Sequence, residues 1–214
     1  MSERDDSILT GIRLVSWDVD GTLFSYLRLS AALARMVARC GMRTGWGNAA
    51  RQARETWEFH RTVEKQRRGL NSTVIAAELA PFARAQEAES RMLEAALAAI
   101  PPRQRALNLL RRFSAAGVPQ VALSDFECAY KLRSLGLAEH FAGTYSCRSL
   151  GFWKPSPVSL ARIQQDFGLD PGQHLHVGDR PDTDGEACAR NGCHFMLIDR
   201  LPKLWKPFNA VCAL

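Results

Sequence analysis

Short apolar runs alternate along this chain with longer segments in which apolar residues recur at helical spacing. Three runs are typical of buried parallel strands: 12–17, 118–123 and 174–177. Three segments of helical periodicity each end at a glycine: 103–116, 128–135 and 157–167. The alternation of strand and helix predicts an α/β fold, in which a Rossmann-like parallel sheet carries helices on both faces.

Each predicted strand has a polar residue at its carboxyl end. Asp18 follows the first strand, Ser124 the second, and Gly178-Asp179 the third. In parallel sheets that are covered by helices, ligands bind beyond the carboxyl ends of the strands. We therefore expect these polar side chains to converge on one site.

Residues 25–99 interrupt the alternation, because they contain successive helical stretches and no convincing strand. The stretches cover about 27–40, 47–68, 71–80 and 83–99. We infer an all-helical unit at 25–99, inserted into an α/β core formed by 1–24 and 100–214. Pro101-Pro102 marks the return to the core, and the two connections near residues 25 and 100 could act as a hinge.

The composition is that of a soluble globular protein. Its 214 residues, 46% of them hydrophobic, suffice for one sizeable core with a smaller insert. No apolar run is long enough to span a bilayer, and residues 1–6 lack the basic-then-apolar pattern of a secretion signal. We expect a cytoplasmic protein without a membrane partner, and the sequence leaves its oligomeric state open.

Neither the cysteines nor the histidines form a pattern of disulfides or zinc ligands. The six cysteines are dispersed without CxxC spacing, which indicates reduced thiols. His174 and His176 alternate on a predicted strand and have no cysteine or histidine partner at ligand spacing. A structural zinc site is therefore not expected.

The net charge of +6 comes mainly from the helical stretch. Residues 25–99 hold 12 Lys/Arg against 7 Asp/Glu, whereas the rest of the chain holds 16 against 15. Between 51 and 68 both signs are interspersed, as on a solvated helix face. We therefore expect no nucleic-acid partner.

The residues with the clearest chemistry are two carboxylates in the sequence Asp18-Val19-Asp20-Gly21-Thr22-Leu23. One carboxylate can attack phosphorus, while the other gives a proton to the leaving oxygen and then accepts one from water. Gly21 makes possible the turn in which the pair lies. Taken alone, the same pattern also fits an ordinary turn or a fragment of a calcium-binding loop.

The downstream residues give this pair a context. After Asp-x-Asp-Gly-Thr-Leu come the strand-terminal Ser124, then Lys154-Pro155, and then Gly178-Asp179 with Asp184-Gly185. This order resembles the four sequence motifs of the haloacid dehalogenase (HAD) superfamily, over residues 12 to about 200. The helical insert between the first and second motifs resembles the C1-type cap of the phosphoglycolate phosphatase-like subfamily.

The resemblance implies a magnesium-dependent phosphohydrolase and a role for each motif residue. Asp18 resembles the nucleophile that forms an aspartyl phosphate, and Asp20 resembles the general acid/base. Ser124 resembles the hydroxyl that binds a phosphoryl oxygen, and Lys154 the lysine that balances charge on the phosphoryl group and the nucleophile. The implied Mg²⁺ ligands are Asp18, the main-chain carbonyl of Asp20, Asp179, and Asp184 through water or as a positioning group.

Other positions bear on the substrate, which the resemblance implies to be a small phosphorylated metabolite. Asp125 follows Ser124 where the family frequently has asparagine, so it could alter contacts beside the phosphate. Asp182 matches no family position, and we interpret it as a helix N-cap. In the cap, candidates to contact an anionic substrate are Arg51, Arg67 and Arg68. The aromatic set there favours a small cap core over a pocket lining: Trp46, Trp57, Phe59 and His60.

Several alternatives stay open to different degrees. Dehalogenases lack an acid/base aspartate at the position of Asp20, and phosphonatases use a cap lysine, for which Lys65 is the only candidate in residues 25–99. A sugar phosphomutase keeps the Asp18/Asp20 pair but returns the phosphoryl group to a second hydroxyl. A non-catalytic phosphate- or partner-binding protein would not need the complete acidic set. We predict a phosphatase.

Overall fold

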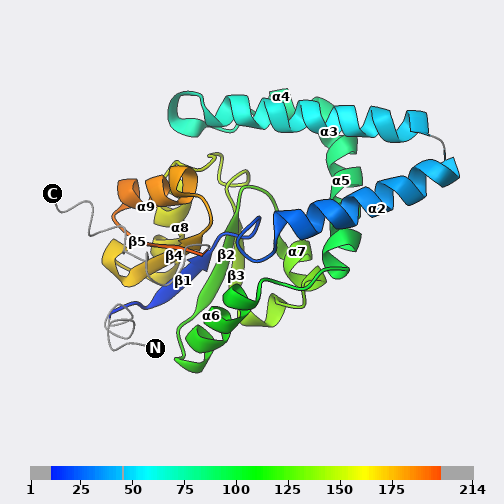
Figure 1. Cartoon of the computed structure of the whole chain (residues 1–214). Coiled ribbons are helices and arrows are strands. Elements are labelled where there is room, and N and C mark those ends of the chain that lie inside the picture. Colours follow the sequence, from blue (N-terminus) through cyan, green and yellow to red (C-terminus); the bar gives the residue numbers. More distant parts are fainter. Residues whose placement is uncertain (1–10, 45, 199–214) are drawn as a thin grey trace.

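A five-stranded parallel sheet forms the centre of the computed structural model, which describes residues 11–44 and 46–198 (Figure 1). The strands are β1 (Leu14–Trp17), β2 (Gln120–Ser124), β3 (Gly143–Ser146), β4 (His174–Gly178) and β5 (His194–Leu197). Their order is β3-β2-β1-β4-β5, and every neighbouring pair is parallel. The predicted fold class is confirmed, and β1 lies in the middle of the sheet.

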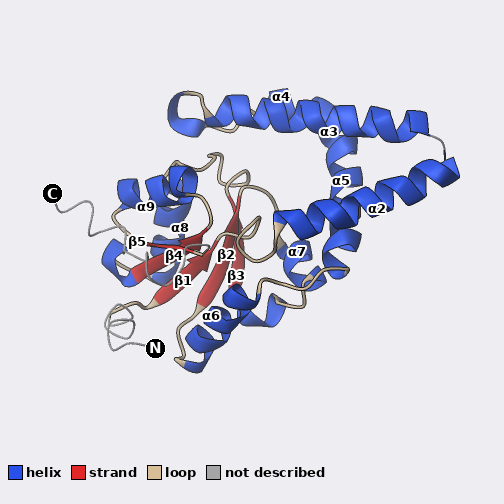
Figure 2. Ribbon diagram, viewed as in Figure 1, coloured by secondary structure: helices blue, strands red, loops and turns tan. Residues whose placement is uncertain are grey.

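Helices cover both faces of this sheet (Figure 2). They are α6 (Gln104–Ala115), α7 (Ala129–Ser134), α8 (Val158–Phe167) and α9 (Glu186–Asn191). Trp17, the last residue of β1, packs in a buried cluster with Leu110 of α6, whereas Leu14, the first, packs with Ile163 of α8 in a second cluster. Because both faces are buried, β1 is apolar along most of its length instead of alternating between apolar and polar residues.

The helical unit, residues 26–98, lies beyond the carboxyl ends of the central strands (Figure 1). It contains α2 (Tyr26–Thr44), α3 (Trp46–Arg67), α4 (Ala76–Leu79) and α5 (Ala83–Ala98), with 3₁₀ turns at Leu70–Ser72 and Ala80–Phe82. Its two connections to the sheet lie side by side, since the amide of Arg103 donates to the carbonyl of Leu23 (2.8 Å). The proposed division into two domains stays a prediction, and residues 1–10 and 199–214 lie outside the described part.

Two features of the fold differ from the expectation. The stretch predicted as a helix at 71–80 is helical only in short pieces, and Thr73 forms an antiparallel bridge with Phe152 instead. β3 and β5 were not predicted, because Gly143–Ser146 lacks an apolar run and the run that begins at Phe195 is too short to distinguish a strand from a piece of helix. The remaining short turns are Ala138–His140, Pro171–Gln173 and the π turn Pro181–Gly185.

Helix ends in the core follow the predicted glycines. Gly168 caps α8 in the left-handed conformation (φ 61°), which residues other than glycine rarely adopt. Four of the six cysteines are buried free thiols, as predicted, whereas Cys212 and the side chain of Cys40 lie outside the described part. Among the described helices, none has the length and apolar character to cross a membrane.

Candidate active site

The loop after β1 holds Asp18 at the carboxyl end of the central strand. The amide of Asp18 donates to the carbonyl of Val177 in β4 (2.8 Å), and the hydroxyl of Thr22 donates to its Oδ2 (2.9 Å). Gly21 has φ 90°, and a Cβ there would collide with the side chain of Asp179. As predicted, the turn depends on Gly21, which lets the first and fourth motifs approach each other.

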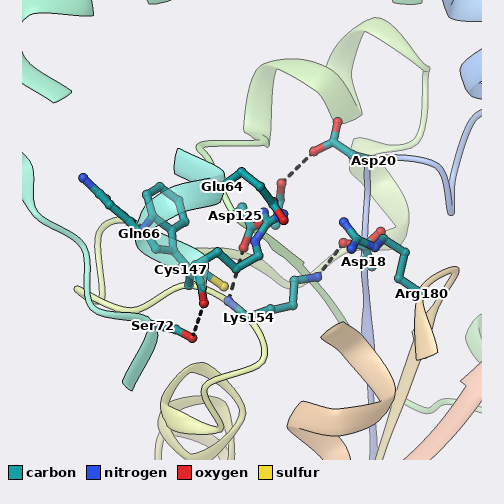
Figure 3. Close-up of polar contacts among 12 residues, drawn as sticks. Asp18, Asp20, Glu64, Gln66, Ser72, Asp125, Cys147, Lys154 and Arg180 are labelled. Atoms are coloured by element: carbon teal, nitrogen blue, oxygen red, sulfur yellow. Dashed lines mark hydrogen bonds and ion pairs between the residues drawn. The ribbon is translucent and has the colours of Figure 1, made fainter. Parts of the chain in front are cut away.

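Lys154 joins two buried carboxylates, and Figure 3 shows its side chain extended toward one of them, Asp18. Its Nζ donates to Oδ1 of Asp18 (2.5 Å) and to Oδ1 of Asp184 (2.6 Å). All three side chains are buried, with 4%, 6% and 1% of Lys154, Asp18 and Asp184 exposed. Burial alone would lower the pKa of Lys154, but attraction by the two carboxylates outweighs it and raises that pKa well above its usual value.

Three carboxylates converge here, those of Asp18, Asp179 and Asp184, each with an oxygen within 4.8 Å of the others. Burial and repulsion from Asp184 raise the pKa of Asp179 to about 6. Burial also raises the pKa of Asp18 well above its usual value, despite the attraction of Lys154. The single positive charge of Lys154 does not balance three carboxylates. Carboxylate oxygens are the ligands that Mg²⁺ prefers, so the cluster suits this ion. The predicted metal-binding side chains do come together.

The side chain of Asp20 is not part of this cluster, and it pairs with a different lysine. The Nζ of Lys131, on α7, donates to both carboxylate oxygens of Asp20 (2.6 Å each), and the hydroxyl of Ser124 donates to Oδ2 (2.9 Å). Burial opposes ionisation, but Lys131 and Ser124 outweigh it and lower the pKa of Asp20. Lys131 was not predicted; its position on the first helix after the Ser124 strand was the available signal.

Ser124 and Asp125, both predicted to bind substrate, contact other side chains of the protein in this structure. The hydroxyl of Ser124, expected to bind a phosphoryl oxygen, donates to Asp20. Oδ2 of Asp125 pairs with the guanidinium of Arg67 from α3, and Oδ1 accepts a long hydrogen bond from the amide of Lys154 (3.5 Å). Asp125 therefore lies where the helical unit meets the core.

A chain of buried polar side chains supports Asp184 from behind. Nε2 of His176 lies 3.4 Å from Asp184, and its Nδ1 lies 2.7 Å from the hydroxyl of Ser16, which also contacts Nε2 of His174 (2.7 Å). Burial lowers the pKa of both histidines, for His174 to about 3, so both are neutral. The histidines were predicted not to bind zinc; their contact with the site was not foreseen.

Asp182 is not the helix N-cap that we expected. Its carboxylate pairs with the guanidinium of Arg180 (2.7 Å) inside the π turn, and no side chain caps the amides at the start of α9. The main-chain amide of Arg180 donates instead to Asp184 (3.2 Å). A local ion pair satisfies the carboxylate of Asp182, so that prediction is wrong.

A cavity of about 830 Å³ opens above these residues, between the core and the helical unit. Core side chains line its base, and α2, α3 and α5 line its upper wall. Of the three candidate arginines only Arg67 is among the lining residues, and the carboxylates of Glu64 and Asp125 pair with it. Arg51 and Arg68 are exposed and do not line it. The structure therefore supports a contact with substrate only for Arg67.

The aromatic residues of the helical unit divide between core and surface. Phe59 is buried in a cluster with Trp153, as expected for a small core, although it also lines the cavity. Trp57 is 60% exposed, so the core interpretation is wrong for this residue. His60 is exposed and lines the cavity. The side chain of Trp46 lies outside the described part.

Comparisons with known proteins agree with this geometry. A profile of haloacid dehalogenase-like hydrolases matches residues 12–192. The chain is similar to the HAD-hydrolase YfnB from Bacillus subtilis bound to magnesium (16% identity, 87% of this chain and 88% of that chain, TM-score 0.63). It is also similar to a HAD phosphatase from Thermococcus onnurineus (17%, 89% and 88%, 0.63) and to L-2-haloacid dehalogenase from Xanthobacter autotrophicus (19%, 90% and 79%, 0.60). At these low identities, the structural similarity shows that the proteins share a fold. A search of curated proteins gave no match.

Proposed function

The chain belongs to the haloacid dehalogenase-like hydrolases, and we propose that it is a magnesium-dependent phosphatase acting on a small phosphorylated metabolite. The observation that carries the proposal is the contact of Lys154 with both Asp18 and Asp184, beside Asp179. It combines a nucleophile, a cation and oxygen ligands at one point. Asp20 adds the second carboxylate that phosphate transfer needs and that dehalogenases lack at this position.

Asp18 is the proposed nucleophile. Thr22 and Lys154 each hold one of its carboxylate oxygens, which orients the group before substrate arrives. Attack on phosphorus forms a bond from the carboxylate oxygen and breaks the bond to the leaving oxygen, which gives an aspartyl phosphate. Water then attacks phosphorus and releases inorganic phosphate from Asp18. Lys154 opposes the charge of the phosphoryl oxygens in both steps.

Asp20 is the proposed general acid and base. Its lowered pKa keeps it ionised before substrate binds. It would take up a proton when the negative phosphoryl group beside it raises its pKa, give that proton to the leaving oxygen in the first step, and accept one from the attacking water in the second. Lys131 and Ser124 hold its carboxylate. The hydroxyl of Ser124 can turn about one bond toward a phosphoryl oxygen when substrate enters. Asp125, beside Ser124, is proposed to act on the substrate side of the same pocket.

Asp18, Asp179 and the main-chain carbonyl of Asp20 would hold Mg²⁺, with Asp184 as a water-mediated ligand or positioning group. The raised pKa values of Asp18 and Asp179 support this assignment, because burial and then repulsion between the carboxylates raise them, and a bound cation would offset both effects. When bound, the metal supplies charge that stabilises the phosphoryl group during transfer.

The helical unit is proposed to be a cap domain, residues 25–99, over a core of 1–24 and 100–214. A cavity of about 830 Å³ lies within the range of pockets for small molecules, about 300–1,000 Å³. Its upper wall comes from the helical unit, so we expect that wall to select the leaving group. Lys65, the candidate lysine for phosphonatase chemistry, is exposed and is not among the lining residues.

The test is hydrolysis of p-nitrophenyl phosphate with Mg²⁺, followed by a panel of phosphorylated metabolites. We expect turnover by the wild type, loss on chelation of Mg²⁺, and a fall in kcat of at least about 10³-fold in Asp18→Asn. The amide keeps the size of Asp18 but removes the attacking oxygen's charge. Full activity in Asp18→Asn, or no turnover on the whole panel, would refute the proposal.

The products of the reaction distinguish a phosphatase from the other enzymes of this fold. A phosphatase releases one inorganic phosphate for each leaving group, whereas a phosphomutase forms an isomer of the substrate with little phosphate. A dehalogenase releases halide from a 2-haloacid, which we do not expect here because Asp20 is present. Phosphate and halide assays on the same preparation therefore decide among the three reactions.

A further inference from the structure

The helical unit contacts the core through a strap, defined as residues 68–74, which directly follows α3. The amide of Trp153 donates to the carbonyl of Ser72 (2.7 Å), and the amide of Val74 donates to the carbonyl of Gly151 (2.9 Å). These bonds flank the bridge between Thr73 and Phe152. The strap therefore pairs with residues 151–153, which immediately precede Lys154.

Gln66 adds a side-chain bond to the same place. Its Oε1 accepts from the indole Nε1 of Trp153 (3.0 Å) and from the amide of Ile75 (3.2 Å), and its Nε2 donates to the carbonyl of Ile75 (3.1 Å). Gln66 is 4% exposed and Trp153 is fully buried. One amide group thus joins the end of α3, the strap and the indole of Trp153.

The strap has an uncommon backbone conformation. Asn71 (φ 63°) and Ser72 (φ 50°) both lie in the left-handed region, which residues other than glycine rarely adopt. This turn presents the carbonyl of Ser72 to Trp153, and the hydroxyl of Ser72 donates to the carbonyl of Arg67 (3.0 Å). The chain therefore maintains an uncommon turn at the point of contact with Trp153.

The main chain of Lys154 lies in a turn and belongs to no strand of the described sheet; the amide of Ser156 closes this turn on the carbonyl of Trp153 (3.0 Å). Within the described part of the chain, the amide of Lys154 makes one long bond, to Oδ1 of Asp125 (3.5 Å), and Asp125 pairs with Arg67 next to the strap. In the view of Figure 3, Gln66 and Ser72 lie on one side of Lys154 and Asp18 lies on the other. Contacts from the helical unit thus meet the lysine's backbone while its ammonium group reaches Asp18 and Asp184.

We propose that Gln66 is a positioning residue that acts through Trp153 to keep Lys154 within reach of Asp18. The proposal rests on the phosphatase function for its effect on rate. The helical unit then supports catalysis even for a substrate too small to touch its wall. A purely structural role is the competing explanation, since Phe59 and Phe126 also pack near Trp153.

The core contains a matched control for this hydrogen bond. Oε1 of Gln120 accepts from Nε1 of Trp17 at 3.0 Å, and both residues are buried. Trp17, however, belongs to β1 and pairs with β2 and β4 on its two sides. Loss of its indole bond should therefore leave the backbone in place, whereas Trp153 has no flanking strands.

The experiment compares Gln66→Met with Gln120→Met, since methionine keeps the length of the side chain without its amide. We expect both variants to melt at a lower temperature. At a temperature where both are folded, only Gln66→Met should lower kcat for p-nitrophenyl phosphate, by about 10- to 100-fold with KM nearly unchanged. Equal kcat losses in the two variants, or none in Gln66→Met, would overturn the proposal.

A double-mutant cycle separates positioning from general destabilisation. If Gln66 acts through the lysine, Gln66→Met should reduce kcat much less in a Lys154→Met background than in the wild type. Independent effects that multiply would contradict the proposal. Should Gln66→Met fail to fold, Trp153→Phe removes the same bond from the other side, with Trp17→Phe as its control.

Hydrogen–deuterium exchange gives a readout that needs no activity. The peptide over residues 150–156 should exchange faster in Gln66→Met than in the wild type or in Gln120→Met. Unchanged exchange would overturn the proposal regardless of any rate. A wild type that hydrolyses no phosphoester would instead refute the proposed function, while exchange would still show whether Gln66 holds the segment before Lys154.

Discussion

The α/β core and the helical unit supply side chains to the same cavity by different physical means. In the core, Asp18, Ser124 and Asp179 lie at or next to the carboxyl ends of adjacent strands. The helical unit contacts the core through apolar packing, with Leu29 of α2 and Leu97 of α5 in the buried core cluster, and at the strap through individual hydrogen bonds. A sheet holds its strand ends cooperatively, whereas a single hydrogen bond contributes only about 1 kcal/mol.

This difference teaches where the site is rigid and where it can be adjusted. Asp18 and Asp184 belong to elements that the sheet and the buried histidines support. Lys154 lies in a turn, and the residues just before it pair with the strap of the helical unit. Substitutions in the core should therefore change chemistry directly, and substitutions in the strap should change it through the placement of Lys154.

The largest effect is expected from Lys154→Met, at the point where the two regions meet. The variant leaves Asp18 and Asp184 buried without their ammonium group and removes the charge that opposes the phosphoryl oxygens. We expect kcat for p-nitrophenyl phosphate to fall by about 10³-fold. The matched control is Lys65→Met on the exposed face of α3, which should keep kcat within about twofold. A small effect of Lys154→Met on kcat would show that the ammonium group of Lys154 is not required for phosphate transfer.

A smaller loss is expected from Lys131→Met, which changes the core without touching the strap. Asp20 would lose the ammonium group that holds both its oxygens, so proton transfer to the leaving group should slow by about 10- to 100-fold. The effect should be greater for an alkyl phosphate than for p-nitrophenyl phosphate, whose leaving group needs less protonation. Arg133→Met on the exposed side of α7 is the control. Equal losses for both substrates would contradict a role through Asp20.

The smallest expected effect is the contribution of His174 to the free energy of unfolding as the pH is lowered. The folded-state pKa of His174 is about 3, below its ordinary value of 6.5, so between these pH values the unfolded chain binds more protons. Stability from this residue is full above pH 6.5 and declines as the pH falls. At pH 5.5 the loss is about 1.4 kcal/mol relative to pH 8.

The measurement is urea unfolding at both pH values in the presence of a chelator, for the wild type and for His174→Gln. Asp179 has a raised pKa and acts with the opposite sign, so the informative quantity is the difference between the two proteins. The wild type should lose more stability between pH 8 and pH 5.5 than the variant does. The same loss in both would mean that His174 titrates normally in the folded core.

Much of the core could be predicted because its signals are local. The apolar run before Asp18 and the glycine after α8 each reflect preferences of a few consecutive residues. Thr73 and the residues around it were assigned to a helix, since their pairing with Phe152 depends on a distant segment. Asp182 was predicted to be a helix N-cap, but its carboxylate forms an ion pair with the neighbouring Arg180 instead.

The sequence by itself determined the order of the motifs and the placement of polar residues at strand ends, because both are properties of consecutive residues. The resemblance assigned Lys154 to the nucleophile Asp18, whereas only the tertiary structure decided that Lys131 serves Asp20. Lys131 lies 111 residues from Asp20 along the chain, and Lys154 lies 136 residues from Asp18. Such pairs depend on how helices pack on the sheet, and local preferences carry no information about that packing.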